Sequence, residues 1–476
     1  MPKSKTFAGI LWAGLQRFGT MLVAFVCNII LARLLTPKDF GTVGMLLLFI
    51  VIAEVFIDSG FGAALIQRKN VGSKEYSTVF FLNLGISVIL YVLLFCASPF
   101  VANFYDIPIL CPMLRIEGLV LFGNALCVIQ TSLMRKNMEF KVLACANLIG
   151  NIGASTIAII AAYKGLGVWS LVIRVVGIAY LTAICLWIMS NWRPILVFEK
   201  RIVKDLFSFG GYMLLSTSLN KLSANIQTII IGKLFSQKAL GLYTQALSLR
   251  NVAADSLQNV VAQVLFPDFS NARDDKEISY KLNNSFYVIT YFTTALLVFL
   301  IIVGKPLIVC LYSEKWIDAV PYFKILCIGG IFYAIQDINY YLIAAKGKSK
   351  ILSSVNLIKL PFFIIALYIF GKYCGTEAIL WCIVANSLIT YIIYAYIATK
   401  LLDISIYTQL GNLSKSIGIA CLTGFVLLSF CNLYNEVTPI LNLTISSFSY
   451  LTIFSLFSVI FKVYPFKYLL KILSKK

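Results

Sequence analysis

The segment LARLLTPKDFGTVGM at residues 31–45 indicates how the chain is built, because a second copy follows later. Residues 231–245 read IGKLFSQKALGLYTQ, and each copy is a short basic turn between two apolar runs. The copies align without a gap, pairing Arg33 with Lys233, Leu34 with Leu234, Thr36 with Ser236, Lys38 with Lys238 and Gly41 with Gly241. The spacing predicts an internal repeat. Thr36 followed by Pro37 predicts an N-cap and the first residue of a helix.

The composition is that of a membrane protein. Of the 476 residues, 60% are hydrophobic and 13% are charged, against about 25% charged residues in a soluble domain. The mean hydropathy is +0.89. Apolar runs of about 20 residues, the length that crosses a bilayer as a helix, recur along the whole chain. The sequence therefore predicts an all-α polytopic membrane protein and argues against a soluble one.

About fourteen transmembrane helices are expected. The predicted spans are 10–34, 40–67, 76–101, 112–133, 143–163, 168–189, 207–234, 241–266, 284–311, 320–345, 352–371, 376–399, 413–432 and 440–462. Six spans separate the two copies of the turn, so the copies have the same orientation. This predicts two parallel six-helix bundles, residues 1–200 and 201–400. Residues 401–476 are expected to add two helices and a basic cytoplasmic tail.

The charge pattern predicts the orientation. The net charge is +20, from 40 Lys and Arg against 20 Asp and Glu. The basic residues gather in alternate connections and at both ends, rather than in one basic domain. By the positive-inside rule both termini are cytoplasmic, in a multi-pass protein. No nucleic-acid partner is expected.

The residue types argue against catalysis. The chain has no histidine, and its 12 cysteines lie almost entirely within apolar runs without CxxC spacing. Imidazole bases, Ser-His-Asp triads and the commonest zinc ligand are therefore excluded. No catalytic residue, metal site or cofactor is expected, and the chain is not predicted to be an enzyme.

Ionisable residues within the spans are the candidate site residues, because each is costly in hydrocarbon unless it faces a wet cavity or a partner. In the first half, Arg17 lies in the first span, and Glu54 and Asp58 share one face of the second. Arg17 is at a similar depth and is a candidate partner for these carboxylates. The alternative for Asp58 is that it only ends its helix.

In the second half, Lys221 lies in the seventh span, and Arg250 and Asp255 lie in the eighth. The alternative for Arg250 is a structural ion pair with Asp255. Weaker candidates are Arg174, Asp337 and Lys359, the last two as a potential pair. The carboxylates Glu54, Asp58 and Asp255 are candidates for a coupling ion, H⁺ or Na⁺, and the sequence does not choose between these ions.

Two segments resemble a known family. LARLLTPKDFG (31–41), followed by FIDSGFGAALIQ (56–67), is similar to the opening of the polysaccharide transporters, and GLYTQALSLRNVA (241–253) is similar to the start of their second half. These are the Wzx-type flippases of lipid-linked oligosaccharides in the multidrug/oligosaccharidyl-lipid/polysaccharide (MOP) superfamily. The branch most similar to this chain exports polymers of colanic-acid and teichuronic-acid type.

The resemblance implies a MATE-like fold in the bacterial inner membrane. It also implies transport of undecaprenyl-pyrophosphate-linked repeat units to the outer leaflet, for lipopolysaccharide, exopolysaccharide or capsule. The partners implied are the lipid-linked oligosaccharide, membrane lipids, and a polysaccharide polymerase with its chain-length machinery. In this superfamily helices 1, 2, 7 and 8 line the central cavity, which would place Arg17, Lys221 and Arg250 there.

Two other classes are weighed against a flippase working by alternating access. A small-molecule or multidrug antiporter would favour an acidic or apolar cavity, whereas the candidates here have a cationic excess. A membrane enzyme such as a polymerase or ligase would need a sizeable outer loop with catalytic residues, and the expected outer loops are short.

Overall fold

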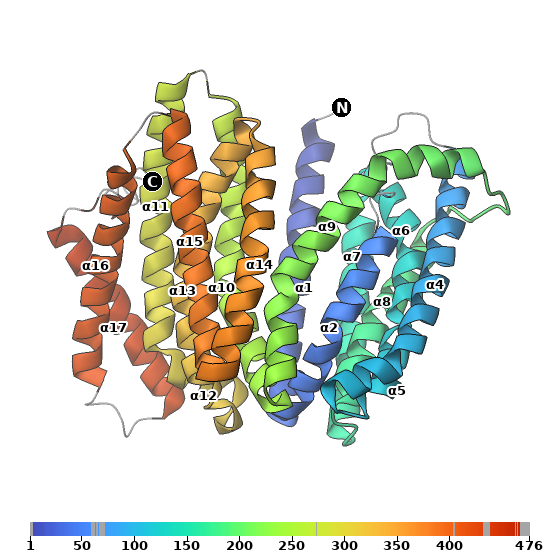
Figure 1. Ribbon diagram of the computed structural model, residues 1–476, viewed down its shortest axis with the longest axis horizontal. Coiled ribbons are helices and arrows are strands. Elements are labelled where there is room, and N and C mark those ends of the chain that lie inside the picture. The colour runs from blue at the N-terminus through green and yellow to red at the C-terminus, as the bar shows by residue number, and fades with distance from the viewer. Residues whose placement is uncertain are drawn as a thin grey trace. The chain divides into compact units, whose positions relative to one another are not determined.

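The computed structural model is helical wherever it is regular, and no strand occurs in the part it describes (Figure 1). The described residues are 3–58, 62, 65, 72–272, 274–402, 405–431, 438–461, 463, 465 and 466, without the side chains of 3–7, 10, 58, 204–216, 219, 220, 255–264, 430 and 431. Two compact units divide the chain: the first unit is Met1–Gly241 and the second unit is Leu242–Lys476. The predicted domain boundaries at residues 200 and 400 stay a prediction.

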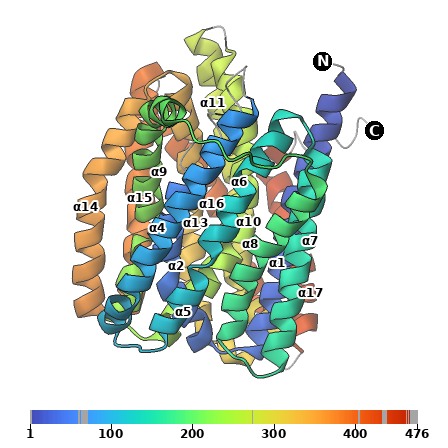
Figure 2. The same ribbon diagram turned by 90° about the vertical axis from the view of Figure 1, so that its right-hand side faces the viewer.

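The first unit contains the helices α1 to α9 and the start of α10. Their bounds are α1 Lys3–Leu34, α2 Pro37–Asp58, α4 Ser73–Tyr105, α5 Leu110–Glu117, α6 Val120–Lys136, α7 Phe140–Tyr163, α8 Trp169–Met189, α9 Lys200–Leu234 and α10 Gln237–Ser270. Figure 2 shows α4, α6, α8 and α7 of this unit. Helix α7 packs against both α1 and α8.

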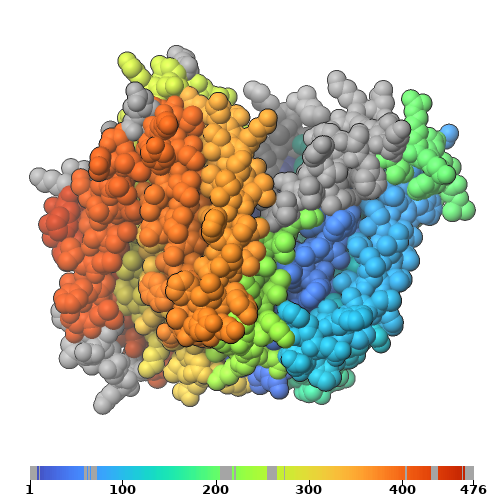
Figure 3. Space-filling model, in the orientation of Figure 1, coloured from blue at the N-terminus to red at the C-terminus, as the bar shows by residue number. Residues whose placement is uncertain are grey.

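The second unit contains the rest of α10 and the elements up to α17. Their bounds are α11 Asp275–Ile302, α12 Gly304–Tyr312, η1 Glu314–Trp316, α13 Ala319–Ala345, α14 Ser349–Cys374, α15 Thr376–Leu402, α16 Ile406–Cys431 and α17 Pro439–Ile460. Helix α13 packs against α11 and α15. The exposed face of α14, orange in Figure 3, is apolar over residues 357–370, as expected for contact with lipid; it carries Leu357, Ile358, Phe362 and Ile365.

Twelve helical segments in the described residues are long and apolar enough to cross a membrane. They coincide with twelve of the fourteen predicted spans, and α5 with α6 forms one of them, Leu110–Lys136. The other two predicted spans correspond to α9 and α10, which are 35 and 34 residues long and include the stretches whose side chains are not described. The all-α polytopic class is confirmed, and the count of fourteen stays a prediction.

The repeated turns begin helices in the same way. Helix α2 starts at Pro37, as predicted, and Thr36 and Asp39 cap it reciprocally. The Asp39 amide donates to Thr36 Oγ1 (3.4 Å), and the amide and hydroxyl of Thr36 donate to Asp39 Oδ2 (2.9 and 2.7 Å). In the second copy, the amide of Ala239 donates to Ser236 Oγ (3.2 Å) at the start of α10.

The same two helix starts touch each other within the first unit. A Cβ atom added at Gly41 would lie 1.7 Å from the carbonyl oxygen of Gln237, and one at Gly241 would lie 1.8 Å from the carbonyl oxygen of Pro37. No side chain fits at such distances. The two glycines of the repeat therefore allow the backbones of α2 and α10 to cross directly.

The two carboxyl-terminal helices are held within the second unit by buried polar contacts. Asn339 of α13 and Gln409 of α16 exchange two hydrogen bonds through their side-chain amides (3.3 and 3.2 Å), and both are fully buried. The Tyr450 hydroxyl of α17 donates to the carbonyl of Ala295 in α11 (2.9 Å). Helices α16 and α17 pack against α11.

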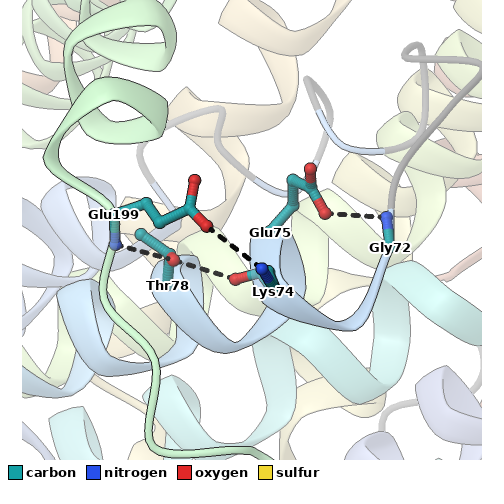
Figure 4. A network of polar contacts seen from close by, with 5 residues as sticks. All are labelled: Gly72, Lys74, Glu75, Thr78 and Glu199. Carbon is teal, nitrogen blue, oxygen red and sulfur yellow. Dashed lines mark hydrogen bonds and ion pairs between the residues drawn. The ribbon is translucent and has the colours of Figure 1, made fainter.

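The connection from α8 to α9 follows the start of α4 as an extended segment. The amides of Ile195 and Glu199 donate to the hydroxyls of Ser77 (3.0 Å) and Thr78 (3.2 Å). Lys74 lies 4.0 Å from the Glu199 carboxylate, as Figure 4 shows. This connection is therefore fastened to α4 through hydroxyl acceptors and one exposed ion pair.

Candidate functional site

Arg250 is the most deeply buried cation of the predicted set. It lies on α10 in the second unit with 9% of its surface exposed. Its guanidinium carbon is 5.5 Å from the ring centroid of Tyr333 on α13. Its Nε and Nη1 atoms have no hydrogen-bond partner among the described residues. Arg250 is therefore a buried cation that lies over an aromatic ring, and two of its nitrogen atoms find no acceptor among the described residues.

Helix α13 presents a polar and aromatic face near Arg250. Tyr333, Asp337 and Tyr341 follow one another at intervals of four residues, and the phenol of Tyr341 interacts electrostatically with both others. Tyr333 is 40% exposed. Tyr340 adds a ring contact to Tyr394 of α15, with centroids 6.1 Å apart. This face has the residue types that stack on sugar rings and hydrogen-bond to hydroxyl groups.

Lys359 is not paired with Asp337. Its ammonium group donates to the hydroxyl of Thr390 on α15. Asp337 is half-buried and interacts electrostatically with Tyr394 as well as with Tyr341. The hypothesis of an ion pair between Lys359 and Asp337 finds no counterpart in the part of the second unit that the structure describes.

Two of the predicted cations lie in the first unit and are exposed; one of them, Lys221, was expected in the second half. Arg17 on α1 and Lys221 on α9 both present their side chains at the surface of the unit. Neither forms an ion pair with a described residue, so Arg17 is not paired with Glu54. An unpaired cation in a membrane helix indicates contact with water, a headgroup or an anionic ligand.

Glu54 has a different partner. Its carboxylate accepts a hydrogen bond from the side-chain amide of Asn124 on α6 (2.8 Å). Glu117, the last residue of α5, interacts electrostatically with Glu54 and is only 2% exposed. Sequence reasoning missed Glu117 and Asn124. An acidic residue within the apolar span 112–133 was the available signal for Glu117.

Arg174 joins two helices of the first unit. Its Nη2 donates to the carbonyl oxygen of Ala24 on α1 (3.4 Å), while its Nε has no partner among the residues described. Because α1 and α8 both pack on α7, this contact supports a structural role for Arg174.

Two predicted carboxylates lie outside the described side chains. Asp58 is the last residue of α2, and Asp255 lies within α10. Their side chains are not part of the description. The alternatives raised for them, a helix end for Asp58 and an ion pair of Asp255 with Arg250, therefore stay open. Among the described side chains, no group of three or more acidic, cysteine or histidine residues gathers as a metal site would require.

The fold matches a solved structure over nearly its whole length. The inward closed conformation of the lipid II flippase MurJ superimposes with a TM-score of 0.75 and 16% identity, over 94% of this chain and 99% of that one. At this identity the match shows the fold alone.

Three relatives match over most of their sequence. The teichuronic acid biosynthesis protein TuaB of Bacillus subtilis (strain 168) is 26% identical, over 88% of this chain and 87% of TuaB. The lipopolysaccharide biosynthesis protein WzxC of Escherichia coli (strain K12) is 24% identical, over 82% of this chain and 81% of WzxC. The succinoglycan biosynthesis transport protein ExoT of Rhizobium meliloti (strain 1021) is 25% identical, over 82% of this chain and 79% of ExoT.

The family model for polysaccharide biosynthesis proteins matches residues 30–321, which is more than half of the chain. Both copies of the repeated turn lie within this range. The resemblance inferred from these turns is thus confirmed, and so is the expectation of a transporter rather than an enzyme. The chain belongs to the polysaccharide biosynthesis protein family, as a multi-pass membrane transporter.

Proposed function

We propose that the protein is an inner-membrane flippase for undecaprenyl-pyrophosphate-linked oligosaccharide repeat units. In this proposal the charged headgroup crosses from the cytoplasmic to the outer leaflet by alternating access around a cationic cavity, while the lipid tail stays in the bilayer. Both termini are cytoplasmic, and a polysaccharide polymerase with its chain-length machinery receives the product. The names of the relatives, which refer to teichuronic acid, lipopolysaccharide and succinoglycan, support a polysaccharide precursor as the substrate.

The observation that carries the proposal is the buried guanidinium of Arg250, whose Nε and Nη1 atoms have no hydrogen-bond partner among the described residues. Burying a cation without an acceptor is costly, so these donors favour an anionic ligand at this position; the alternative acceptor is Asp255, whose side chain is not described. A guanidinium binds phosphate oxygens through two parallel hydrogen bonds, which suits a pyrophosphate. The guanidinium also makes a cation–π contact with the ring of Tyr333.

The exposed cations Arg17 and Lys221 extend the proposal. Their side chains are free to attract an anionic headgroup as it approaches. A drug antiporter, the alternative raised by the sequence, would favour an acidic or apolar cavity over the three cations Arg17, Lys221 and Arg250. The transport cycle needs a driving ion, and Glu54, Asp58 and Asp255 are the carboxylates proposed to bind H⁺ or Na⁺.

The test is polymer export by Arg250 variants in a strain that lacks the native protein. A charge-assisted hydrogen bond contributes about 1.5–3 kcal/mol, so Arg250→Gln should lower export by about ten- to a hundredfold. Arg250→Lys keeps the charge without the planar fork and should fall between Arg250→Gln and the wild type. Lys372→Gln, at the exposed end of α14, is the matched control and should export normally. Normal export by both Arg250 variants at wild-type protein levels would contradict the proposal.

A further inference from the structure

The connection from α8 to α9 presents apolar side chains outward instead of burying them. Ile195, Leu196 and Phe198 are 42%, 93% and 50% exposed. A single exposed leucine is common on a protein surface, but three large apolar side chains within four residues form a patch. In Figure 1 this connection is the green stretch at the edge of the first unit, next to α4. The functional site proposed above makes no use of it.

The connection is packed onto the first unit on both sides of this patch. Before the patch, the Trp192 ring lies against the rings of Tyr76 and Phe80 on α4, with centroids 6.3 and 5.9 Å apart. After the patch, Ile202 is buried in the same hydrophobic cluster. The patch therefore lies between two fixed points.

The backbone between these points is also held. The amides of Ile195 and Glu199 donate to hydroxyl groups on α4 (3.0 and 3.2 Å), and Figure 4 shows the contact of Glu199. The exposure of Leu196 and Phe198 therefore belongs to a hydrogen-bonded segment with fixed ends. Such a segment presents the same apolar surface continuously to whatever lies beside the first unit.

Basic residues follow the apolar patch directly. Lys200 and Arg201 are exposed and form no ion pair with a side chain that the structure describes. They occupy the first turn of α9, where the helix dipole disfavours cations, so helix stability does not explain them. Residues 193–205 include four basic and two acidic residues, and the carboxylate of Glu199 lies 4.0 Å from Lys74. The surface next to the patch therefore suits an anionic ligand.

The position of the segment along α4 matches the boundary of a bilayer. Helix α4 has 33 residues and is about 50 Å long, against about 30 Å for the hydrocarbon core. Shared between both ends, the excess leaves about 10 Å of α4 outside the hydrocarbon at its start. The hydroxyl groups that hold the segment belong to Ser77 and Thr78, about 6–8 Å from that start. The segment therefore lies at the level of the lipid headgroups, where tryptophans such as Trp192 are enriched.

We infer that residues 195–201 are an interfacial anchor that binds anionic phospholipid. Leu196 and Phe198 insert at the edge of the hydrocarbon, and Lys200 and Arg201 bind the phosphates of neighbouring headgroups. With the orientation predicted from charge, the leaflet is the cytoplasmic one, where basic residues next to a membrane helix meet anionic lipid. The ligand is a phospholipid of the bilayer and is independent of the transported glycan.

The first experiment measures the surroundings of residue 196. The full-length protein, without its native cysteines, carries Leu196→Cys labelled with bimane, in nanodiscs of phosphatidylcholine and phosphatidylglycerol. Brominated lipid should quench the label, and aqueous iodide should not. Lys348→Cys, exposed in the connection from α13 to α14, is the control and should be quenched by iodide. Phe198→Cys provides the same test if Leu196→Cys does not fold.

The second experiment measures the preference for an anionic headgroup. Quenching of the same label by brominated phosphatidylglycerol and by brominated phosphatidylcholine, at equal fractions, gives the ratio of the two affinities at this position. A basic residue near an anionic surface contributes about fivefold, so Lys200→Gln with Arg201→Gln should lower the ratio at least about fivefold. Lys348→Gln with Lys350→Gln removes two exposed charges elsewhere and should leave the ratio unchanged.

The outcomes separate a lipid anchor from a surface for other ligands. Iodide quenching at residue 196 as strong as at residue 348 would overturn the inference, because the patch would face water and suit a protein partner instead. An unchanged ratio in Lys200→Gln with Arg201→Gln would overturn the anionic headgroup as the ligand. A fall in the ratio on adding inorganic phosphate at constant ionic strength would also overturn it, because free phosphate would then occupy the site.

Discussion

At the scale of single residues, Gly41 and Gly241 are the positions where the repeat is under the tightest steric constraint. Each lies against a backbone carbonyl of the opposite helix start, at distances that no side chain tolerates. The aligned turns are therefore related by more than composition. The same residue is required in both for the same physical reason, which is the direct crossing of α2 and α10.

Substitution of either glycine should destabilise the first unit. Gly41→Ala or Gly241→Ala forces backbones apart, and overpacking of this kind costs about 1–3 kcal/mol. We expect a lower thermal unfolding midpoint of the detergent-solubilised protein. Gly85→Ala is the control, since nothing lies within 4 Å of its Cβ position and alanine is the better helix former. A midpoint for Gly41→Ala equal to that of Gly85→Ala would contradict the crossing.

At the scale of elements, the attachment of α16 depends on two buried amides. Asn339 and Gln409 satisfy each other, so removing one leaves the other unsatisfied in the interior. Asn339→Leu alone should cost about 1–3 kcal/mol, and so should Gln409→Leu. The double variant replaces both partners with apolar groups and should recover most of the loss in unfolding midpoint. Additive losses in the double variant would show that the two amides do not act as a pair.

The helices themselves were predictable because their signals are local. The length of each apolar run, the helix start at Thr36–Pro37 and the repeated turn can all be read from short stretches of sequence. The bounds of the described helices agree closely with them. The site was predictable only in part. Arg250 was named as an ionisable residue within a predicted span, but the contacts of Glu54 with Asn124 and of Arg174 with Ala24 depend on how distant helices face one another. No pattern along the chain encodes that register.

At the scale of the whole molecule, the orientation in the membrane is a prediction from charge alone. Lys164, in the connection from α7 to α8, is expected outside, and Lys348, between α13 and α14, is expected in the cytoplasm. In a cysteine-free background, Lys164→Cys should react with a membrane-impermeant maleimide in intact cells. Lys348→Cys should react only after the cells are opened. The reverse pattern would invert the direction of transport proposed above.

The central claim is that this protein moves a lipid-linked repeat unit between leaflets. The most direct measurement is the leaflet location of the undecaprenyl-pyrophosphate-linked glycan in cells depleted of the protein. A membrane-impermeant probe for the glycan, added to spheroplasts, reports the outer leaflet. We predict that depletion raises the total amount of this lipid and abolishes its labelling from outside, and that Arg250→Gln does the same in part. Unchanged labelling from outside after depletion would contradict the claim.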